Sequence, residues 1–158
     1  MRTAAQIQSV LKLFEQNKLQ LVLLNAEEAS VHAEALKKNN VSVVVPSAVL
    51  RPRDRLPYNQ AADISRAGVR VAMQSDAEDG ARSLPLMGLF AVQQGWGGDA
   101  ALSALTIDAA RMFGIDDRVG SLETGKDADL LIFSGHPFDA GSRLERVIVG
   151  GREVPDDE

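Results

Sequence analysis

The fold of this chain is decided by residues 68–76, which read GVRVAMQSD. Gly68 is expected to end a helix, and the apolar residues from Val69 to Met73 are expected to form a short strand. Asp76 follows where that strand stops. In parallel α/β sheets, ligands and catalytic groups gather at the carboxyl ends of the strands, so Asp76 is a candidate site residue. The alternative is that its carboxylate only caps the helix that follows.

Two earlier segments repeat the same helix–strand pattern. Residues 19–24 and 41–45 are apolar runs of strand length, as expected for strands that are covered on both faces of a parallel sheet. Asn25 stands just past the first of these runs, in the same topological place as Asp76. Helices are expected over residues 3–17, 27–38 and 58–67. The repeats predict an α/β fold with three parallel strands in sequential order, joined by right-handed crossovers.

A charged, proline-containing loop is expected over residues 51–57. Arg51 and Arg53 in this loop are candidates for binding an anionic group of a substrate, because a guanidinium group pairs with carboxylate or phosphate through two parallel N–H donors. Loops at the carboxyl ends of strands often carry function. The alternative is a solvated connector, which is a common role for segments of this composition.

The chain changes character after residue 117. Helices are expected over residues 84–94, 100–105 and 107–113, the second capped by Asp99 and the last ended by Gly114. The turn-rich segment 119–129 has no helical period, and strands are expected at residues 130–133 and 147–149. We therefore expect an α/β part over residues 1–117 and a small β element over residues 118–158.

Composition excludes several kinds of partner and site. The 158 residues are 45% hydrophobic and 25% charged, and the net charge is −5 without a basic cluster, so nucleic acid and anionic membranes are not expected as partners. The chain has no cysteine, which excludes disulfides and thiolate metal ligands. No apolar run approaches the ~20 residues that cross a bilayer. The first residues show no signal-peptide pattern, so we expect a cytoplasmic protein.

Four segments together resemble the carboxyl-terminal part of the amidohydrolase superfamily. Residues 101–114 resemble the helix pair that ends the barrel of that superfamily. Residues 119–130, which read VGSLETGKDADL, resemble the hallmark of its carboxyl-terminal β-sandwich return. Residues 68–76 are similar to the last barrel strand, which ends in a metal-binding Asp, and residues 146–154 are similar to the final sandwich strands. The chain resembles the imidazolonepropionase-like metal-dependent hydrolases in particular.

The resemblance implies part of a TIM-type (βα)8 barrel, in which residues 19–24, 41–45 and 69–73 are the sixth, seventh and eighth strands. The first five strands and their metal ligands are expected to be absent. Members hydrolyse a C–N bond of a non-peptide or cyclic amide with a water activated by zinc or another divalent metal. Asp76 would bind this metal and accept the proton of the water. The sixth-strand His of the family would fall at or beside Asn25, where this chain has no histidine, and Asn25 is a poor zinc ligand that could orient substrate.

The two histidines do not replace the missing ligands. His32 lies within a predicted helix, where it is expected to face solvent, and His136 lies in a turn of the β element. A zinc site needs three or four protein ligands, and only Asp76 matches a ligand of the family. We therefore expect the chain alone to bind zinc weakly or not at all.

Two hypotheses on function remain open. In the first, the chain is an amidohydrolase, or the carboxyl-terminal piece of one, and another chain or a second copy supplies the missing ligands. In the second, it is a non-catalytic truncated fragment that serves as a structural or oligomerisation module. Three strands would leave two edges and one apolar face uncovered. Under either hypothesis we expect a homo-oligomer, or a complementary chain that supplies the missing strands.

Overall fold

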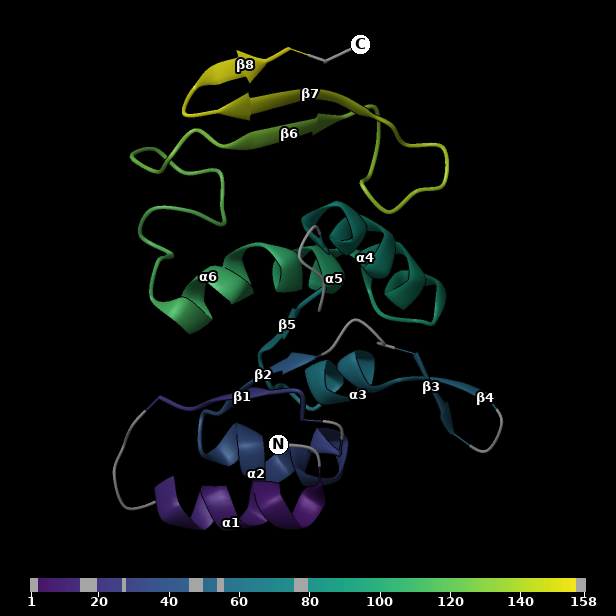
Figure 1. Cartoon of the computed structure of the whole chain (residues 1–158), viewed down its shortest axis with the longest axis vertical. Coiled ribbons are helices and arrows are strands. Elements are labelled where there is room, and N and C mark those ends of the chain that lie inside the picture. Colours follow the sequence, from purple (N-terminus) through teal and green to yellow (C-terminus); the bar gives the residue numbers. More distant parts are fainter. Residues whose placement is uncertain are drawn as a thin grey trace.

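In the computed structural model, a parallel sheet with its helices, a helical layer and an antiparallel sheet follow one another along the long axis of the molecule (Figure 1). The structure describes residues 3–14, 20–26, 28–45, 50–53, 56–75 and 80–155, and of residues 50–53, 56–59, 81 and 82 it describes the backbone alone. Helices and parallel strands alternate in the first half of the chain. The predicted α/β class is therefore confirmed.

The parallel sheet contains three strands in the order β1 (Val22–Leu24), β2 (Ser42–Val45) and β5 (Val71–Met73). Both strand pairs are parallel, which confirms the sequential order that the helix–strand repeats predict. All four residues of β2 are buried. This is expected for the central strand of a sheet that is covered on both faces, and it explains why the strand is apolar almost throughout.

One face of the sheet packs on the helices that precede and connect its strands. These are α1 (Ala4–Phe14), the 3-10 turn η1 (Ala29–His32), α2 (Ala33–Lys38) and α3 (Gln60–Arg66). Ile7 of α1, Leu36 of α2 and Ile64 of α3 are fully buried in the same hydrophobic core as Val43 of β2. The helix predicted over residues 27–38 thus consists of a 3-10 turn followed by a short α-helix.

The opposite face of the sheet is covered by α6 (Ile107–Phe113). The helix before it, α5 (Gly98–Leu105), contributes Ala101 and Ala104 to the same hydrophobic core as Val43. Val44 and Ala72 pack with Met112 of α6, and they are 4% and 2% exposed. The prediction that this face is uncovered is wrong at these positions, because α6 folds back across the sheet. Leu24, at the end of the edge strand β1, remains 50% exposed.

A two-stranded antiparallel hairpin takes the place of the predicted loop. β3 (Leu50–Arg53) pairs with β4 (Leu56–Asn59), with Pro52 opposite Pro57. The prediction of an irregular loop over residues 51–57 is therefore wrong. A strand of a two-stranded ribbon has one unpaired side, so proline can occupy it without removing a needed hydrogen bond.

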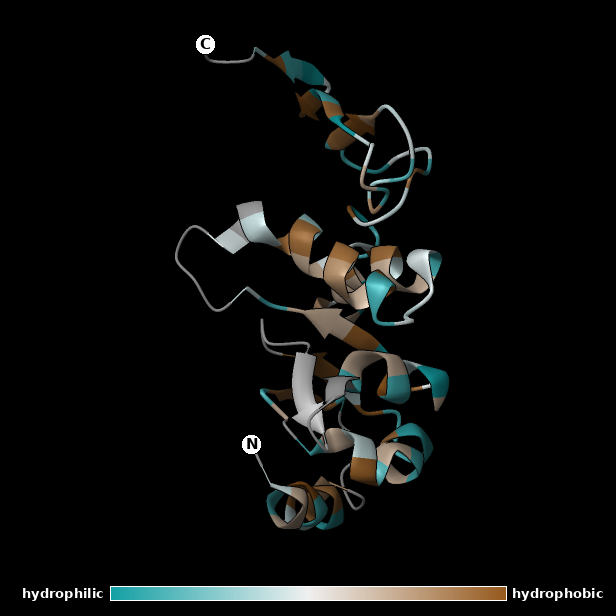
Figure 2. Ribbon diagram, turned by 90° about the vertical axis from the view of Figure 1, so that its right-hand side faces the viewer, coloured by the Kyte–Doolittle hydropathy of each residue, from teal (hydrophilic) through white to brown (hydrophobic). Residues whose placement is uncertain are grey.

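The carboxyl-terminal sheet is antiparallel, and it confirms the predicted small β element. Its strands are β6 (Leu130–Phe133), β7 (Leu144–Val149) and β8 (Arg152–Val154). Figure 2 shows that the hydrophobic helix α4 (Leu84–Gln93), which follows the 3-10 turn η2 (Gly80–Ser83), lies between this sheet and the parallel one. Phe138, in the loop between β6 and β7, is 4% exposed and packs directly on Gly88 of α4.

The ends of the helices in the helical layer differ in part from prediction. Asp99 does not cap α5, since Gly97 is the N-cap residue and Asp99 lies in the first turn of the helix. Its carboxylate can still interact favourably with the positive end of the helix dipole. Gly114 ends α6 in the left-handed conformation, with φ of 66°, as predicted. Across the described ranges, no helix combines the length and the hydropathy that a membrane crossing requires.

Candidate functional site

The carboxyl ends of the three parallel strands meet at one edge of the sheet, where Asn25 follows β1 and Gln74 follows β5. Asn25 is the one predicted site residue whose side chain the structure describes at this edge. Asp76 lies outside the described residues, so its role stays a prediction. Arg51 and Arg53 lie in β3, of which only the backbone is described. Their predicted contact with an anionic group therefore also stays a prediction.

Asn25 turns the chain at the end of β1. Its φ is 55°, in the left-handed region, which asparagine adopts more readily than most residues other than glycine. Its backbone N–H donates to the carbonyl oxygen of Val44 at 3.2 Å, which extends the parallel ladder by one residue beyond β1. The half-buried side chain is thereby fixed at the carboxyl edge of the sheet.

Gln74 binds the side chain of Asn25 across the end of the central strand. The Nε2 group of Gln74 donates to Oδ1 of Asn25 at 2.5 Å, although the two residues are 49 positions apart in the sequence. The backbone N–H of Gln74 donates to the carbonyl oxygen of Val45 at 3.1 Å. The sequence interpretation missed Gln74. A signal was available, because positions 74 and 76 of an extended segment share one face.

Gln60 provides a second amide at this edge. It is the first residue of α3 and is 4% exposed, and its Nε2 group donates to the carbonyl oxygen of Ala26 at 2.5 Å. Its Oε1 atom is buried and has no hydrogen-bond partner among the described residues. The sequence interpretation did not identify Gln60 either, since a polar residue at a helix start gives no sign that it is buried. Asn25 and Ala26 are thus held by two glutamines from different elements.

The described residues do not assemble a metal centre. Within the described ranges, no group of three or more histidine, aspartate and glutamate side chains lies close enough to hold an ion. His32 is half-buried and its Nε2 atom has no partner among the described residues, so the prediction that it faces solvent is wrong. His136 lies between β6 and β7, and its Nδ1 atom accepts the backbone N–H of Phe138 at 3.2 Å. Neither histidine replaces a ligand at the sheet edge.

Among the residues that the structure describes, the groups with shifted pKa values lie in the carboxyl-terminal part of the chain. A hydrogen bond from Ser121 and the charge of Lys126 lower the pKa of the Glu123 carboxyl. A bidentate hydrogen bond from Arg146 lowers the pKa of Glu153 in the same way, with N···O distances of 2.7 and 2.8 Å. These pairs stabilise turns and strands of the antiparallel part, and they do not mark a catalytic acid or base.

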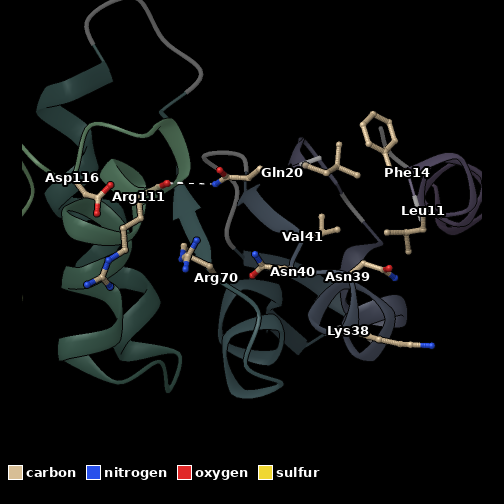
Figure 3. A pocket seen from close by; sticks show the side chains of 11 residues that line it. Leu11, Phe14, Gln20, Lys38, Asn39, Asn40, Val41, Arg70, Arg111 and Asp116 are labelled. Carbon is tan, nitrogen blue, oxygen red and sulfur yellow. Dashed lines mark hydrogen bonds between the residues drawn. The ribbon is translucent and has the colours of Figure 1, made fainter. Parts of the chain in front are cut away.

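A cavity of about 690 Å³ opens at the opposite end of the parallel strands, where they begin (Figure 3). Arg70 and Arg111 approach Asp108 with N···O distances of 3.8 and 3.6 Å, and Gln20 Nε2 donates to the carbonyl oxygen of Arg111 at 3.4 Å. The cavity is also lined by Leu11, Phe14, Leu21, Lys38, Asn39, Asn40, Val41 and Asp116. In parallel α/β folds this end of the sheet serves stability, so we place the candidate site at the carboxyl edge.

Comparison with known proteins relates this arrangement to a family. The sequence profile of the Amidohydrolase family matches residues 18–154. Imidazolonepropionase from Porphyromonas gingivalis is 32% identical over 143 residues, which are 84% of this chain and 33% of that protein. The chain therefore spans about a third of the length of this curated relative.

Solved structures show the same arrangement of elements. The crystal structure of an amidohydrolase from Thermotoga maritima MSB8 matches with a TM-score of 0.84 and 30% identity, over 98% of this chain and 42% of that one. An adenosine deaminase from Xanthomonas campestris, solved with bound Zn, matches with a TM-score of 0.57 and 20% identity, over 84% of this chain and 36% of that one. The second match concerns the fold alone.

Proposed function

This chain belongs to the amidohydrolase family, and on that premise we propose that it carries the carboxyl-terminal part of an enzyme that hydrolyses a C–N bond of a non-peptide or cyclic amide. The observation that carries the proposal is the family match over residues 18–154, which includes the parallel sheet, the helical layer and the antiparallel sheet. The similarity to an imidazolonepropionase makes imidazolonepropionate, a cyclic amide with a carboxylate side chain, the first substrate to test.

In the proposed arrangement, β1, β2 and β5 are the sixth, seventh and eighth strands of a TIM-type barrel. Their parallel, sequential order and the match to the Thermotoga maritima amidohydrolase support this assignment. Residues 1–117 would form the barrel part and residues 118–158 part of a β-sandwich. The change from helices to an antiparallel sheet after α6 supports a boundary near residue 117.

Four residues have proposed roles in this reaction. Asp76 would accept a proton from the attacking water and would be the metal ligand of this chain, because it follows the strand that resembles the eighth. Asn25 would bind the reacting part of the substrate from the end of β1. Arg51 and Arg53 would bind the carboxylate of an anionic substrate through their guanidinium groups. All four residues follow strands of the parallel sheet in the sequence.

The described residues do not fit a zinc ion by themselves. Zinc sites take three or four nitrogen, sulfur or carboxylate ligands. Asn25 offers only its Oδ1 atom, which already accepts the hydrogen bond from Gln74. We therefore propose that the remaining ligands come from a complementary chain or from a second copy of this chain, which would also extend the three-stranded sheet.

The proposal is tested on the chain isolated with whatever it binds in its source cells. The preparation is incubated with imidazolonepropionate, and mass spectrometry measures whether the substrate gains one water. We expect hydrolysis that is lost in Asp76→Ala and retained in Asp139→Ala, which removes an exposed carboxylate in the antiparallel part. Elemental analysis of the same preparation measures the metal content.

Two results would contradict the proposal. One is the absence of hydrolysis with imidazolonepropionate and with a panel of other cyclic amides, such as hydantoin and dihydrouracil. The other is full activity in Asp76→Ala. Elemental analysis that finds about one metal ion per chain in the isolated chain, lost in Asp76→Ala, would correct the proposed need for ligands from another chain.

A further inference from the structure

The hydrogen bond between Gln74 and Asn25 has a direction, and that direction decides what Asn25 can bind. Nε2 of Gln74 donates, and Oδ1 of Asn25 accepts. The Asn25 amide is planar and its Oδ1 atom faces Gln74, so its Nδ2 group, on the other side of the amide carbon, points away from Gln74. An amide nitrogen carries two N–H donors and offers no acceptor. The free end of the Asn25 side chain is therefore a hydrogen-bond donor.

Resting on the proposed function, we propose that Gln74 is a positioning residue that makes Asn25 a hydrogen-bond donor for the carbonyl oxygen of the substrate amide. Gln74 itself would not touch the substrate. By donating to Oδ1, it disfavours the flipped orientation of the amide, in which the oxygen of Asn25 would point outward to a metal ion or to a donor on the substrate. The site thereby favours a ligand that carries a carbonyl group.

Two further contacts and the backbone conformation hold Asn25 in place independently of Gln74. Its backbone N–H is bound to the carbonyl of Val44 at 3.2 Å. The carbonyl oxygen of the next residue, Ala26, accepts from the buried Gln60 at 2.5 Å. The left-handed φ of 55° then directs the side chain out of the regular alternation of β1. A donor held in this way loses little conformational entropy when a ligand binds, which is the requirement for a preorganised site.

The chemistry of amide hydrolysis gives such a donor a use. Water adds through its oxygen to the carbonyl carbon, and the π electrons of the C=O bond move to the carbonyl oxygen, which becomes an oxyanion. When the C=O bond re-forms, the C–N bond breaks and the nitrogen leaves with a proton, so that one water is consumed. A donor aimed at the oxyanion typically changes the rate by ~10²- to 10³-fold. Asn25 would supply one such donor.

The direction of the hydrogen bond can be tested without any enzymatic activity. The chain has five asparagines, Asn17, Asn25, Asn39, Asn40 and Asn59, so selective 15N labelling gives few side-chain amide signals. The signals of Asn25 are identified by their loss in Asn25→Asp. The probe is 2-pyrrolidinone, a cyclic amide with one carbonyl oxygen. We expect it to shift the Nδ2 proton signals of Asn25 in a saturable way.

Variants at position 74 separate positioning from a merely structural role. Gln74→Met keeps the length and removes the donor, so 2-pyrrolidinone should bind roughly three- to tenfold more weakly, the effect of one hydrogen bond. Gln74→Glu replaces the donor by an acceptor, so Asn25 should turn its Nδ2 group toward position 74 and its response to the probe should disappear. The matched control is Gln93→Met, the same change at an exposed position of α4. The backbone NMR spectrum of each variant checks that it is folded.

The outcomes distinguish a failure of this inference from a failure of the proposed function. If Nδ2 of Asn25 responds to the probe and the response depends on Gln74, the inference stands even when no hydrolysis is found. If the probe leaves Nδ2 unchanged up to its solubility limit, or if Gln74→Met binds the probe as tightly as Gln93→Met, the inference is overturned. Hydrolysis that is unaffected by Gln74→Met would overturn it as well and would leave the proposed function intact.

Discussion

Replacing Gly88 by alanine is expected to destabilise the protein, although alanine is the better helix former. Gly88 lies in the middle of α4, where alanine in place of glycine normally contributes about 1 kcal/mol. A Cβ atom at this position would lie 2.4 Å from Cε1 and 2.5 Å from Cζ of Phe138. It would also lie 3.2 Å from a methyl carbon of Leu105. Ordinary contacts between carbon atoms lie at ~3.5 to 4.0 Å, so the ring would have to move.

The size of the effect follows from what the ring can do. If Phe138 stays in place, overpacking of a well-packed core costs ~1–3 kcal/mol. If the ring leaves the core, where it is 4% exposed, the loss is that of a buried aromatic side chain, ~1.5–3 kcal/mol. The middle of each range exceeds the gain of about 1 kcal/mol in helix propensity, so we expect Gly88→Ala to lower the free energy of unfolding by ~1 kcal/mol and by no more than ~2 kcal/mol.

The assay is urea unfolding, followed by far-UV circular dichroism and by the fluorescence of Trp96. Trp96 is the only tryptophan of the chain, it is 4% exposed, and it lies between α4 and α5. Gly88→Ala is also introduced into the Phe138→Ala variant, which lacks the ring. Once the ring is removed, Gly88→Ala should stabilise the protein by about 1 kcal/mol, the helix propensity alone. Gly141→Ala is the control, because its Cβ would have no neighbour within 4 Å.

The change of sign between the two backgrounds is the critical result. It requires that the ring of Phe138 occupies the space above Gly88, and it does not depend on the exact cost of overpacking. If Gly88→Ala stabilises the protein with Phe138 present, the described packing of the antiparallel part on α4 is incorrect. If it destabilises equally in both backgrounds, the cost does not come from Phe138, and the contact with Leu105 is then its expected source.

Three other predictions concern charge, a buried amide and assembly. Because Arg146 lowers the pKa of Glu153, this pair stabilises the folded state above the ordinary carboxyl pKa of 4.5, and its contribution is lost as the pH falls through the lower pKa of the folded state. In Arg146→Gln the carboxyl titration of Glu153, measured by NMR, should move back toward 4.5, and an unchanged titration would contradict the pairing. Gln60→Glu should destabilise the protein at pH 7, because a buried carboxylate cannot donate to the carbonyl oxygen of Ala26. The loss should be smaller at pH 5, because the protonated carboxyl regains a donor. If the free energy of unfolding falls equally at both pH values, relative to wild type at the same pH, this hydrogen bond is unimportant. Sedimentation equilibrium at micromolar concentration should find a dimer or a larger assembly, because the parallel sheet has three strands and thus two edges. A well-folded monomer with a cooperative melt would refute this expectation.

The sequence predicted the elements that depend on local patterns. The apolar runs at β1, β2 and β5, each preceded by a helical segment, were sufficient to predict a parallel sheet in sequential order, because crossover connections leave few alternatives. The stop at Gly114 was predicted correctly for an equally local reason, since glycine adopts a positive φ without strain. The hairpin of β3 and β4 was missed, because two prolines and several charges are typical of loops and the pairing of the two strands is not visible in their composition.

The sequence alone therefore determined which segments become the strands of the parallel sheet, that Asn25 follows one of them, and which family the chain resembles. Only the tertiary structure decided what these residues contact. The packing of Met112 on Val44 and Ala72, and the hydrogen bond from Gln74 to Asn25, join positions that are far apart in the sequence. Periodicity reports which face of an element is buried and does not report which distant side chain meets it. That partner is chosen by the closest packing of the whole chain and by the need of each buried polar group for a hydrogen bond.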